Sequence, residues 1–456
     1  MKDLTQGTVA RNLMHIAAFL AASMLLQTLY LLVDMYWVGR LGKEAVAAVG
    51  LAGTVSFIVL ALTQALGVGT TTLIAHAAGA KDQARARSVF NQALVLSLIS
   101  GLVFLFVAFV GRGAYCRALA ADAETIRMGE QYLAWFLPAL ALQFGVVVMG
   151  SALRGTGIVK PITVIQVITV VLNMVLAPVL IFGWGTGVAV GVAGAALSTL
   201  VAIVLGVVLL VAYFLRSDGY IAFDRTAWKP DLTTWKRMMA IGAPAGGEFL
   251  ILSLYMMLVF RLIQGFGAAA QAGFGIGGRV MQSMFLPVVA IAFAAAPVVG
   301  QNFGARQADR VRETFRWAAM MASAVMVVLT ILCHISPAAL IRPFSPDPTV
   351  ILIGAEYLRI TSWNFVPSAV VFTSSSIFQG IGNSVPPVII SAIRLVCFAV
   401  PAFLMSRRPG FELRHVWYLA VATVLVQMAL NVWLLQREFR RKLRFDVQVA
   451  VPAPAP

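Results

Sequence analysis

The sequence predicts an all-α membrane protein with twelve transmembrane helices, in two six-helix bundles related by a pseudo-two-fold axis along the membrane normal. Three observations lead to this fold class. First, 60% of the 456 residues are hydrophobic and only 11% are charged, whereas soluble domains usually carry about 25% charged residues. Second, apolar segments of about 20 residues, long enough to cross a bilayer, recur along the chain. Third, the two halves repeat the same landmarks at a constant spacing.

Apolar segments bounded by charged residues, Gly and Pro give the helices in chain order. The first half contains helices near 13–38, 46–78, 89–111, 129–152, 161–183 and 187–215. The second half contains helices near 239–262, 272–300, 315–337, 357–378, 385–406 and 415–435. This gives an N-terminal lobe at 1–215, a cytoplasmic linker at 216–238, a C-terminal lobe at 239–436 and a tail at 437–456, which we expect to be basic and then disordered.

An internal repeat connects the two halves. The Gly-Ala-Lys segment at 79–81 recurs as Gly-Ala-Arg at 304–306, an offset of 225 positions. The same offset relates further pairs of residues: Gly42 and Gly267, Gly50 and Gly275, Arg85 and Arg310, Tyr132 and Tyr357, Gly155 and Gly380, Gly157 and Gly382, Pro161 and Pro386. Six helices per repeat is an even number, so both repeats enter the membrane from the same side. Parallel repeats of this kind are typical of carriers that bind substrate between their lobes.

The charge distribution predicts the orientation. The net charge of +16 lies in short runs between apolar segments rather than on one basic face, so we expect no nucleic-acid partner. Most of the 34 Lys and Arg residues fall at the two termini and in the loops on their side. The positive-inside bias therefore places both termini in the cytoplasm of a multi-pass inner-membrane protein. We interpret the repeated basic loops at 79–81 and 304–306 as determinants of topology and lipid contact.

The usual signatures of an enzyme or a metal site do not occur in the sequence. The four His residues form no HExxH motif, and there is no GxSxG nucleophile elbow. The three Cys residues are widely spaced and form no CxxC pair. We therefore predict neither an enzyme nor a bound cofactor or metal.

Ionisable residues inside apolar segments cost at least ~2.5–3.5 kcal/mol to insert, so each requires an explanation. Asp34 lies about 20 residues into the first helix, which at ~1.5 Å per residue places it in the outer half of the membrane. An acid there can take up a proton from outside, and it is our first ion-coupling candidate. The alternative is a structural Asp that is hydrogen-bonded to Asn173 or Thr28. Glu248 is a second candidate, although Arg394 of the same repeat could hold it in a structural pair.

Polar, sulfur-containing and aromatic residues within the segments are candidates for a substrate site. Amides could line a polar cavity, although hydrogen bonds between helices are their more common use. Met side chains repack around different shapes, and aromatic faces attract cations. The candidates are Gln64, Gln143, Gln282, Met256, Met281, Met284, Phe285 and Asn364.

Residues 28–52 (TLYLLVDMYWVGRLGKEAVAAVGLA) resemble the multidrug and toxic compound extrusion (MATE) family. The match depends on Asp34, the turn at 38–42 and the run of small residues at 45–50. Further motifs follow in family order: GAK and GAR after the second and eighth helices, ALRGTG at 152–157, LNMVLAP at 172–178, GVAGAALST at 191–199 and FQGIGNSVPP at 378–387. Together they span almost the whole chain.

The resemblance implies an antiporter that exports amphipathic, often cationic, drugs or toxic metabolites by alternating access. It implies that protons or sodium ions enter through acidic residues inside the lobes, and that Asn173 faces Asp34. We expect a monomer in the lipid bilayer. The rival functions are a lipid-linked precursor flippase of the same superfamily, which would favour several basic residues in its central cavity, and a passive channel.

Three departures from the family pattern affect the coupling site. Relatives often carry Asp four residues after the Asn of the fifth helix, where this chain has Ala177. Many also have Pro early in the first helix, whereas the repeat pairs Pro244 of the seventh helix with Phe19, so a proline-driven bend of the first helix is not expected. The sodium-linked branch has Glu eight residues after this Pro, but Glu248 follows it by four. We therefore prefer a proton as the coupling ion, with sodium as the alternative.

Overall fold

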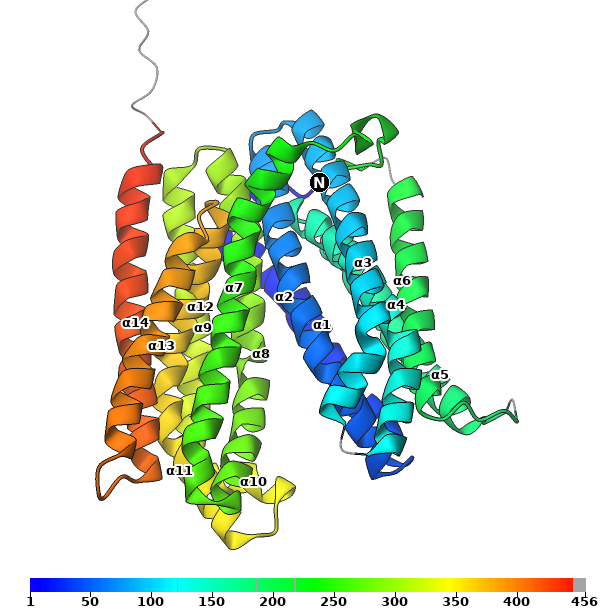
Figure 1. Cartoon of the computed structure of the whole chain (residues 1–456). Coiled ribbons are helices and arrows are strands. Elements are labelled where there is room, and N and C mark those ends of the chain that lie inside the picture. The colour runs from blue at the N-terminus through cyan, green and yellow to red at the C-terminus, as the bar shows by residue number, and fades with distance from the viewer. Residues whose placement is uncertain (121, 186, 217–218, 446–456) are drawn as a thin grey trace, which may run out of the picture. The chain divides into compact units, whose positions relative to one another are not determined.

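The computed structural model describes residues 1–120, 122–185, 187–216 and 219–445, and all regular elements of this part of the chain are helices (Figure 1). The first half contains α1 (Val9–Gly39), α2 (Lys43–Gly79), α3 (Gln83–Leu119), α4 (Ala123–Gly155), α5 (Lys160–Phe182) and α6 (Val192–Arg216). The second half contains α7 (Leu232–Ile263), α8 (Ala268–Gly304), α9 (Ala308–Ile335), α10 (Pro337–Ile341), α11 (Pro348–Thr361), α12 (Phe365–Gly380), α13 (Val385–Ser406) and α14 (Leu413–Lys442).

Eleven helices of the described residues are long and apolar enough to cross a membrane. The segment predicted near 357–378 differs, because it consists of α11 and α12 separated by a 3-10 turn at Ser362–Asn364. Pro367 in the first turn of α12 has no N–H to donate to the carbonyl of Trp363, which favours a break at this point. This twelfth membrane segment is therefore a broken helix that starts earlier than predicted.

The basic residues at the end of the chain continue a membrane helix. α14 extends to Lys442, so residues 437–442, the start of the predicted tail, are helical. Its arginines at 437, 440 and 441 are exposed, whereas Glu438 is buried between them. The terminal VPAPAP, predicted to be disordered, lies outside the described residues.

The backbone repeats with the same offset as the sequence. Lys81 and Arg306 both have positive φ, at 59° and 58°, and are the only non-Gly residues of the described chain that do. Gly157 and Gly382 have φ of 76° and 77°. The helix packing repeats as well, because α3 with α4, α4 with α6 and α5 with α6 match α9 with α12, α12 with α14 and α13 with α14. The predicted repeat is therefore present in the structure.

The described chain forms two compact units. Unit 1 comprises Met1–Lys2, Ala18–Ala78 and Asp82–Phe249, and unit 2 comprises Asp3–Ala17, Gly79–Lys81 and the chain from Leu250 onward. The boundary thus falls inside α7 rather than in the segment expected to be a linker.

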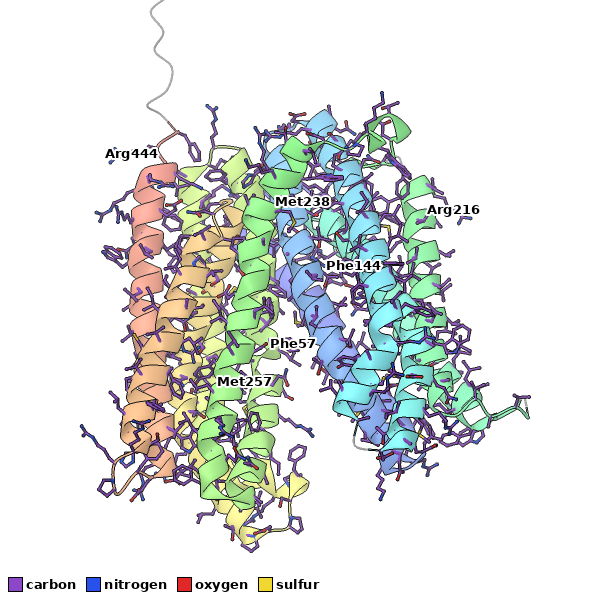
Figure 2. All side chains as sticks on the ribbon, in the orientation of Figure 1. Phe57, Phe144, Arg216, Met238, Met257 and Arg444 are labelled. Carbon is purple, nitrogen blue, oxygen red and sulfur yellow. The ribbon has the colours of Figure 1, made fainter. Side chains whose placement is uncertain are left out.

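Close packing between α2 and the first half of α7 explains this boundary. A Cβ atom at Gly242 would lie 1.8 Å from the carbonyl oxygen of Ala65, and one at Gly246 would lie 2.6 Å from that of Ala61. Small residues spaced by four let two helix backbones touch. Met238, one turn earlier on α7, is fully buried in the same core as Phe144 of α4, and both are labelled in Figure 2.

The N-terminal segment is bound within unit 2. The Leu4 side chain is fully buried, and its N–H donates to Oε1 of Gln301 at 2.9 Å. The Leu4 carbonyl accepts hydrogen bonds from Nδ2 of Asn302 and Nη2 of Arg310, both at 3.3 Å. Arg310 also donates to the carbonyl of Gly7 at 3.0 Å. Arg310 follows the basic loop at 304–306, which we interpret as a topology determinant, and it also binds the N-terminal segment of the chain.

The segment predicted as a linker is attached to α3. Oδ1 of the buried Asn91 accepts hydrogen bonds from the N–H of Asp224 at 2.9 Å and from Nε1 of Trp228 at 3.1 Å. Nε2 of the buried Gln92 donates to the carbonyl of Ala227 at 2.6 Å. Residues 219–231 therefore form a strap on α3 rather than a free connection.

Asp231 ends this strap and starts α7. Its N–H donates to Oε1 of Gln92 at 2.9 Å, and its carboxylate accepts from the Thr234 hydroxyl at 2.6 Å and the Thr233 N–H at 2.9 Å. The hydrogen bond from the Thr234 hydroxyl contributes most to holding the pKa of Asp231 below its usual value. A lowered pKa means that this cap is present at neutral pH and is lost as acidification protonates the carboxylate.

Asn91→Leu should detach the strap. The substitution keeps the size of the side chain but leaves the N–H groups of Asp224 and Trp228 without their acceptor, so we expect a loss of about 1–3 kcal/mol of stability. Thermal unfolding in detergent measures the loss, and trypsin should cleave the strap faster. Gln83→Leu is the control, because Gln83 is exposed on the same helix and donates a single hydrogen bond to this segment. Equal stability of the two variants would contradict the strap.

Two exposed positions test the predicted orientation. Asp347 precedes α11 and Thr226 lies in the strap, and both are exposed. In intact cells of a variant without the exposed Cys397, an impermeant thiol reagent should label Asp347→Cys and leave Thr226→Cys unmodified. The reverse pattern would mean that the termini lie outside.

Candidate functional site

Asp34 is a buried acid inside a membrane helix. It lies near the end of α1, and the residue is only 6% exposed. Its Oδ1 atom is buried and has no hydrogen-bond partner among the described residues. Burying an ionised carboxylate without a partner costs far more than burying the neutral acid. The free-energy cost of burial at this position therefore differs strongly between the two protonation states of Asp34.

Polar side chains of three further helices lie around the segment of α1 that carries this acid. Tyr30, one turn before Asp34 on α1, has its hydroxyl 2.9 Å from Oγ1 of Thr199 on α6. Nδ2 of Asn173 on α5 donates to the same Oγ1 atom at 3.3 Å. Tyr132 of α4 is buried and interacts electrostatically with Asp34 and Tyr30. We call Tyr30, Asp34, Tyr132, Asn173 and Thr199 the acid site.

The structural alternative for Asp34 does not agree with these contacts. The Asn173 amide donates to α6, to Thr199 and to Oγ of Ser198 at 3.4 Å. The Thr28 hydroxyl donates to the carbonyl of Met24 at 3.0 Å. Within the described chain, no hydrogen bond joins Asp34 to either residue. Asp34 is therefore not held by a hydrogen bond to Asn173 or Thr28, and the expectation that Asn173 faces Asp34 stays a prediction.

The second repeat lacks the acid site. At the offset of 225, Asp34, Asn173 and Thr199 correspond to three buried apolar residues: Val259, Phe398 and Val424. The two tyrosines recur as Tyr255 and Tyr357. The site therefore belongs to unit 1 alone.

Arg394 contacts an aromatic ring in unit 2. Its guanidinium carbon lies 4.5 Å from the ring centroid of Tyr255, and its Nε atom is buried without a hydrogen-bond partner among the described residues. Glu248 belongs to unit 1, and its pairing with Arg394 stays a prediction. Pro244 lies inside α7, which continues through it.

The residues predicted for a substrate site are divided between the two units. Gln64 and Gln143 of unit 1 are half-buried on α2 and α4. In unit 2, Gln282 and Met256 are exposed, and Asn364 is buried at the break before α12, with its Oδ1 atom unpartnered in the described part of the chain. Their common role in substrate binding stays a prediction.

The other three candidates pack within unit 2. Sδ of Met281 accepts a hydrogen bond from the Tyr357 hydroxyl at 3.8 Å. Phe285 makes an edge contact with Phe365, with ring centroids 5.3 Å apart. Met284 contacts a thiol of α9. All three side chains are half-buried, and their role in substrate binding also stays a prediction.

Sequence reasoning missed three members of the acid site. In the sequence, Tyr132 stands out only as a landmark of the repeat, and Thr199 only as the end of the motif at 191–199. Tyr30 lies one turn before Asp34, and that spacing on one helix face was the available signal.

Two six-helix repeats in apolar, membrane-length helices, with one buried acid site, define a membrane transporter of the two-lobe type. The model of the MatE family matches residues 20–179 and 244–404. The chain therefore belongs to the MatE family of efflux transporters, and it is a transporter rather than an enzyme.

Relatives match over nearly the whole chain. The probable multidrug resistance protein YoeA of Bacillus subtilis is 26% identical over 418 residues, which cover 91% of this chain and 90% of YoeA. The probable multidrug resistance protein NorM of Thermotoga maritima is 25% identical over 426 residues, which cover 93% of this chain and 91% of NorM.

Solved structures of transporters agree with the fold. An outward-facing multidrug resistance MATE family transporter of the MOP superfamily matches with a TM-score of 0.89 and 25% identity, covering 96% of this chain and 98% of that one. A MOP superfamily transporter from Pyrococcus furiosus, described as having a binding pocket of reverse polarity, matches with the same values. The predicted fold class is thereby confirmed.

Proposed function

We propose that this transporter exports amphipathic, often cationic, drugs in exchange for protons, with Asp34 as the coupling carboxylate. It acts in the inner membrane, with both termini in the cytoplasm. The observation that supports this function most directly is the buried Oδ1 atom of Asp34, which has no hydrogen-bond partner in the described chain although Tyr30, one turn away, bonds to Thr199. The printed names of the relatives support drugs as the substrate class.

Coupling follows from the two charge states of this acid. When Asp34 is ionised, its negative charge lies in the buried interior of unit 1 without a hydrogen-bond partner for Oδ1 among the described residues, and it favours a bound cation. When Asp34 takes up a proton, the charge disappears and so does that attraction. A proton therefore favours the conformation that releases the drug, and proton loss to the cytoplasm restores the binding conformation. Such a shift requires only that the two protonation states prefer different conformations.

The other helices keep the rest of the site in place during this cycle. Asn173 and Tyr30 both bond to Thr199, so α1 and α5 are connected through α6 without using the Asp34 carboxylate. The carboxylate can therefore change its charge without breaking this network.

Transport of a fluorescent cationic dye in everted membrane vesicles tests the function. An imposed proton gradient should drive dye uptake, and its collapse by an uncoupler should stop it. A sodium gradient at constant pH should drive none. Uptake driven only by the sodium gradient would mean that sodium, and not the proton, is the coupling ion. Uptake independent of both gradients would contradict an antiporter.

A further inference from the structure

We propose that protons reach Asp34 through a pocket at the outer end of unit 1, across a thin apolar layer. This inference rests on the proposed function, in which Asp34 is the coupling acid. It adds the route by which the proton enters, and it places that route inside the helix bundle of unit 1.

The pocket has a volume of about 480 Å³. Its walls include Leu41 after α1, Gln131 on α4, Ile181 on α5 and Val192 on α6. The acid site is built on α4, α5 and α6 as well, together with α1, which ends two residues before Leu41. At the mouth, Arg127 lines the pocket and forms an ion pair with Glu124, and both side chains are exposed to water.

The pocket lies outward of the acid site along α1, α5 and α6, whereas on α4 the pocket residue Gln131 directly precedes Tyr132 of the acid site. Leu41 is about two helical turns beyond Asp34, and Ile181 is about two turns beyond Asn173. On α6, which runs in the opposite direction, Val192 is about two turns before Thr199. Along α1, α5 and α6 the pocket residues are therefore about 10 Å from Asp34, Asn173 and Thr199.

A layer of small apolar side chains fills this distance. Val38, Ala177 and Ala195 are each 0% exposed. They belong to one buried cluster with Ile181 of the pocket and Tyr132 of the acid site. None of the three carries a titratable group, so the layer blocks protons until water enters it.

Two of the three side chains in this layer are alanine methyl groups, so little side-chain volume lies between the helices here. A small separation of α1, α5 and α6 would admit a short file of water without displacing a large side chain. A hydronium ion arriving along this water gives its proton to a carboxylate oxygen of Asp34. One O–H bond breaks in the hydronium, one forms on Asp34, and a water molecule remains.

The second repeat provides an internal comparison. At the offset of 225, Trp417 occupies the position of Val192. Its side chain is 1% exposed and stacks on Phe274, with ring centroids 5.5 Å apart and an interplanar angle of 9°. The repeat without the acid site thus fills this position with a large aromatic ring, whereas the repeat with the acid site has Val and a pocket.

A cationic group attached inside the pocket tests the route. In a variant in which the exposed Cys397 is replaced by Ala, Gln131→Cys is modified in intact cells with an impermeant methanethiosulfonate that carries a trimethylammonium group. A fixed positive charge and added bulk at the entrance should slow dye efflux driven by an external acid pulse about tenfold, the scale of electrostatic effects on entry. Dye binding should be unchanged.

Val188→Cys is the matched control. Val188 is 67% exposed and lies in the connection between α5 and α6, but it does not line the pocket. Its modification should leave efflux at the unmodified rate. A second variant, Val192→Trp, introduces the aromatic residue of the second repeat and should slow acid-driven efflux without any reagent.

The outcomes separate this inference from the proposed function. If the Gln131→Cys adduct and Val192→Trp both transport at the wild-type rate while Asp34→Asn is inactive, the proton enters elsewhere and the route is wrong. If Asp34→Asn is active, the proposed function itself fails. Slowing by modification at both Gln131→Cys and Val188→Cys would indicate a general surface effect and would also overturn the route.

Discussion

Asp34→Asn should abolish proton-driven export while leaving the protein folded. The amide has the shape of the neutral acid, so α1 keeps its packing, but the residue can no longer change its charge. Because coupling requires the two protonation states to prefer different conformations, dye uptake into everted vesicles should fall by about tenfold or more. The amount of protein in the membrane and its thermal unfolding in detergent should match the wild type.

Asp34→Glu is the appropriate companion variant, since it retains a titratable group one methylene further from the backbone. It should keep part of the proton-driven uptake. Near wild-type transport by Asp34→Asn would move the coupling role to Glu248, and equal loss in both variants would suggest that packing, rather than the proton, is affected.

Gly242→Ala should cause the largest loss of stability. The new methyl carbon would lie 1.8 Å from the backbone carbonyl oxygen of Ala65, and a backbone atom cannot rotate away as a side chain does. α7 and α2 must therefore separate, at a cost of about 3 kcal/mol or more, the upper range for overpacking. Thermal unfolding in detergent, together with the yield of monodisperse protein, measures the effect.

Gly247→Ala is the control on the same helix, because its Cβ would meet no atom within 4 Å. Alanine is favoured over glycine inside a helix by about 0.8–1.0 kcal/mol, so this variant should be as stable as the wild type or slightly more stable. Similar behaviour of the two alanine variants would mean that α7 does not pack on α2 as described.

The fold was predictable because its signals are long and repeated. An apolar segment that crosses a membrane extends over many residues, and the offset of 225 appears independently in glycines, prolines and tyrosines. The same offset relates the positive φ angles of Lys81 and Arg306. The break before α12 was not predicted, because Ser362–Asn364 lies within a segment that is otherwise of ordinary composition.

The acid site was predictable only in part. Asp34 is conspicuous because an acid inside an apolar helix is costly. The other residues of the site are not conspicuous in the sequence. Tyr30, Tyr132 and Thr199 are common residue types, and only the packing of four helices brings them together. The strap on α3 shows the same limit, because Asn91 binds backbone groups of a distant segment, and such contacts leave no periodic pattern in the sequence.

The exchange of a proton for a drug at Asp34 is tested most directly by proton release from the purified transporter. When a cationic dye is added to wild-type protein in weakly buffered detergent solution, a pH indicator should record protons released in proportion to the dye bound. Asp34→Asn lacks the charge that favours the cation, so at a dye concentration high enough to saturate this weaker site it should bind the dye and release no protons. Equal proton release from the two proteins would contradict Asp34 as the coupling carboxylate.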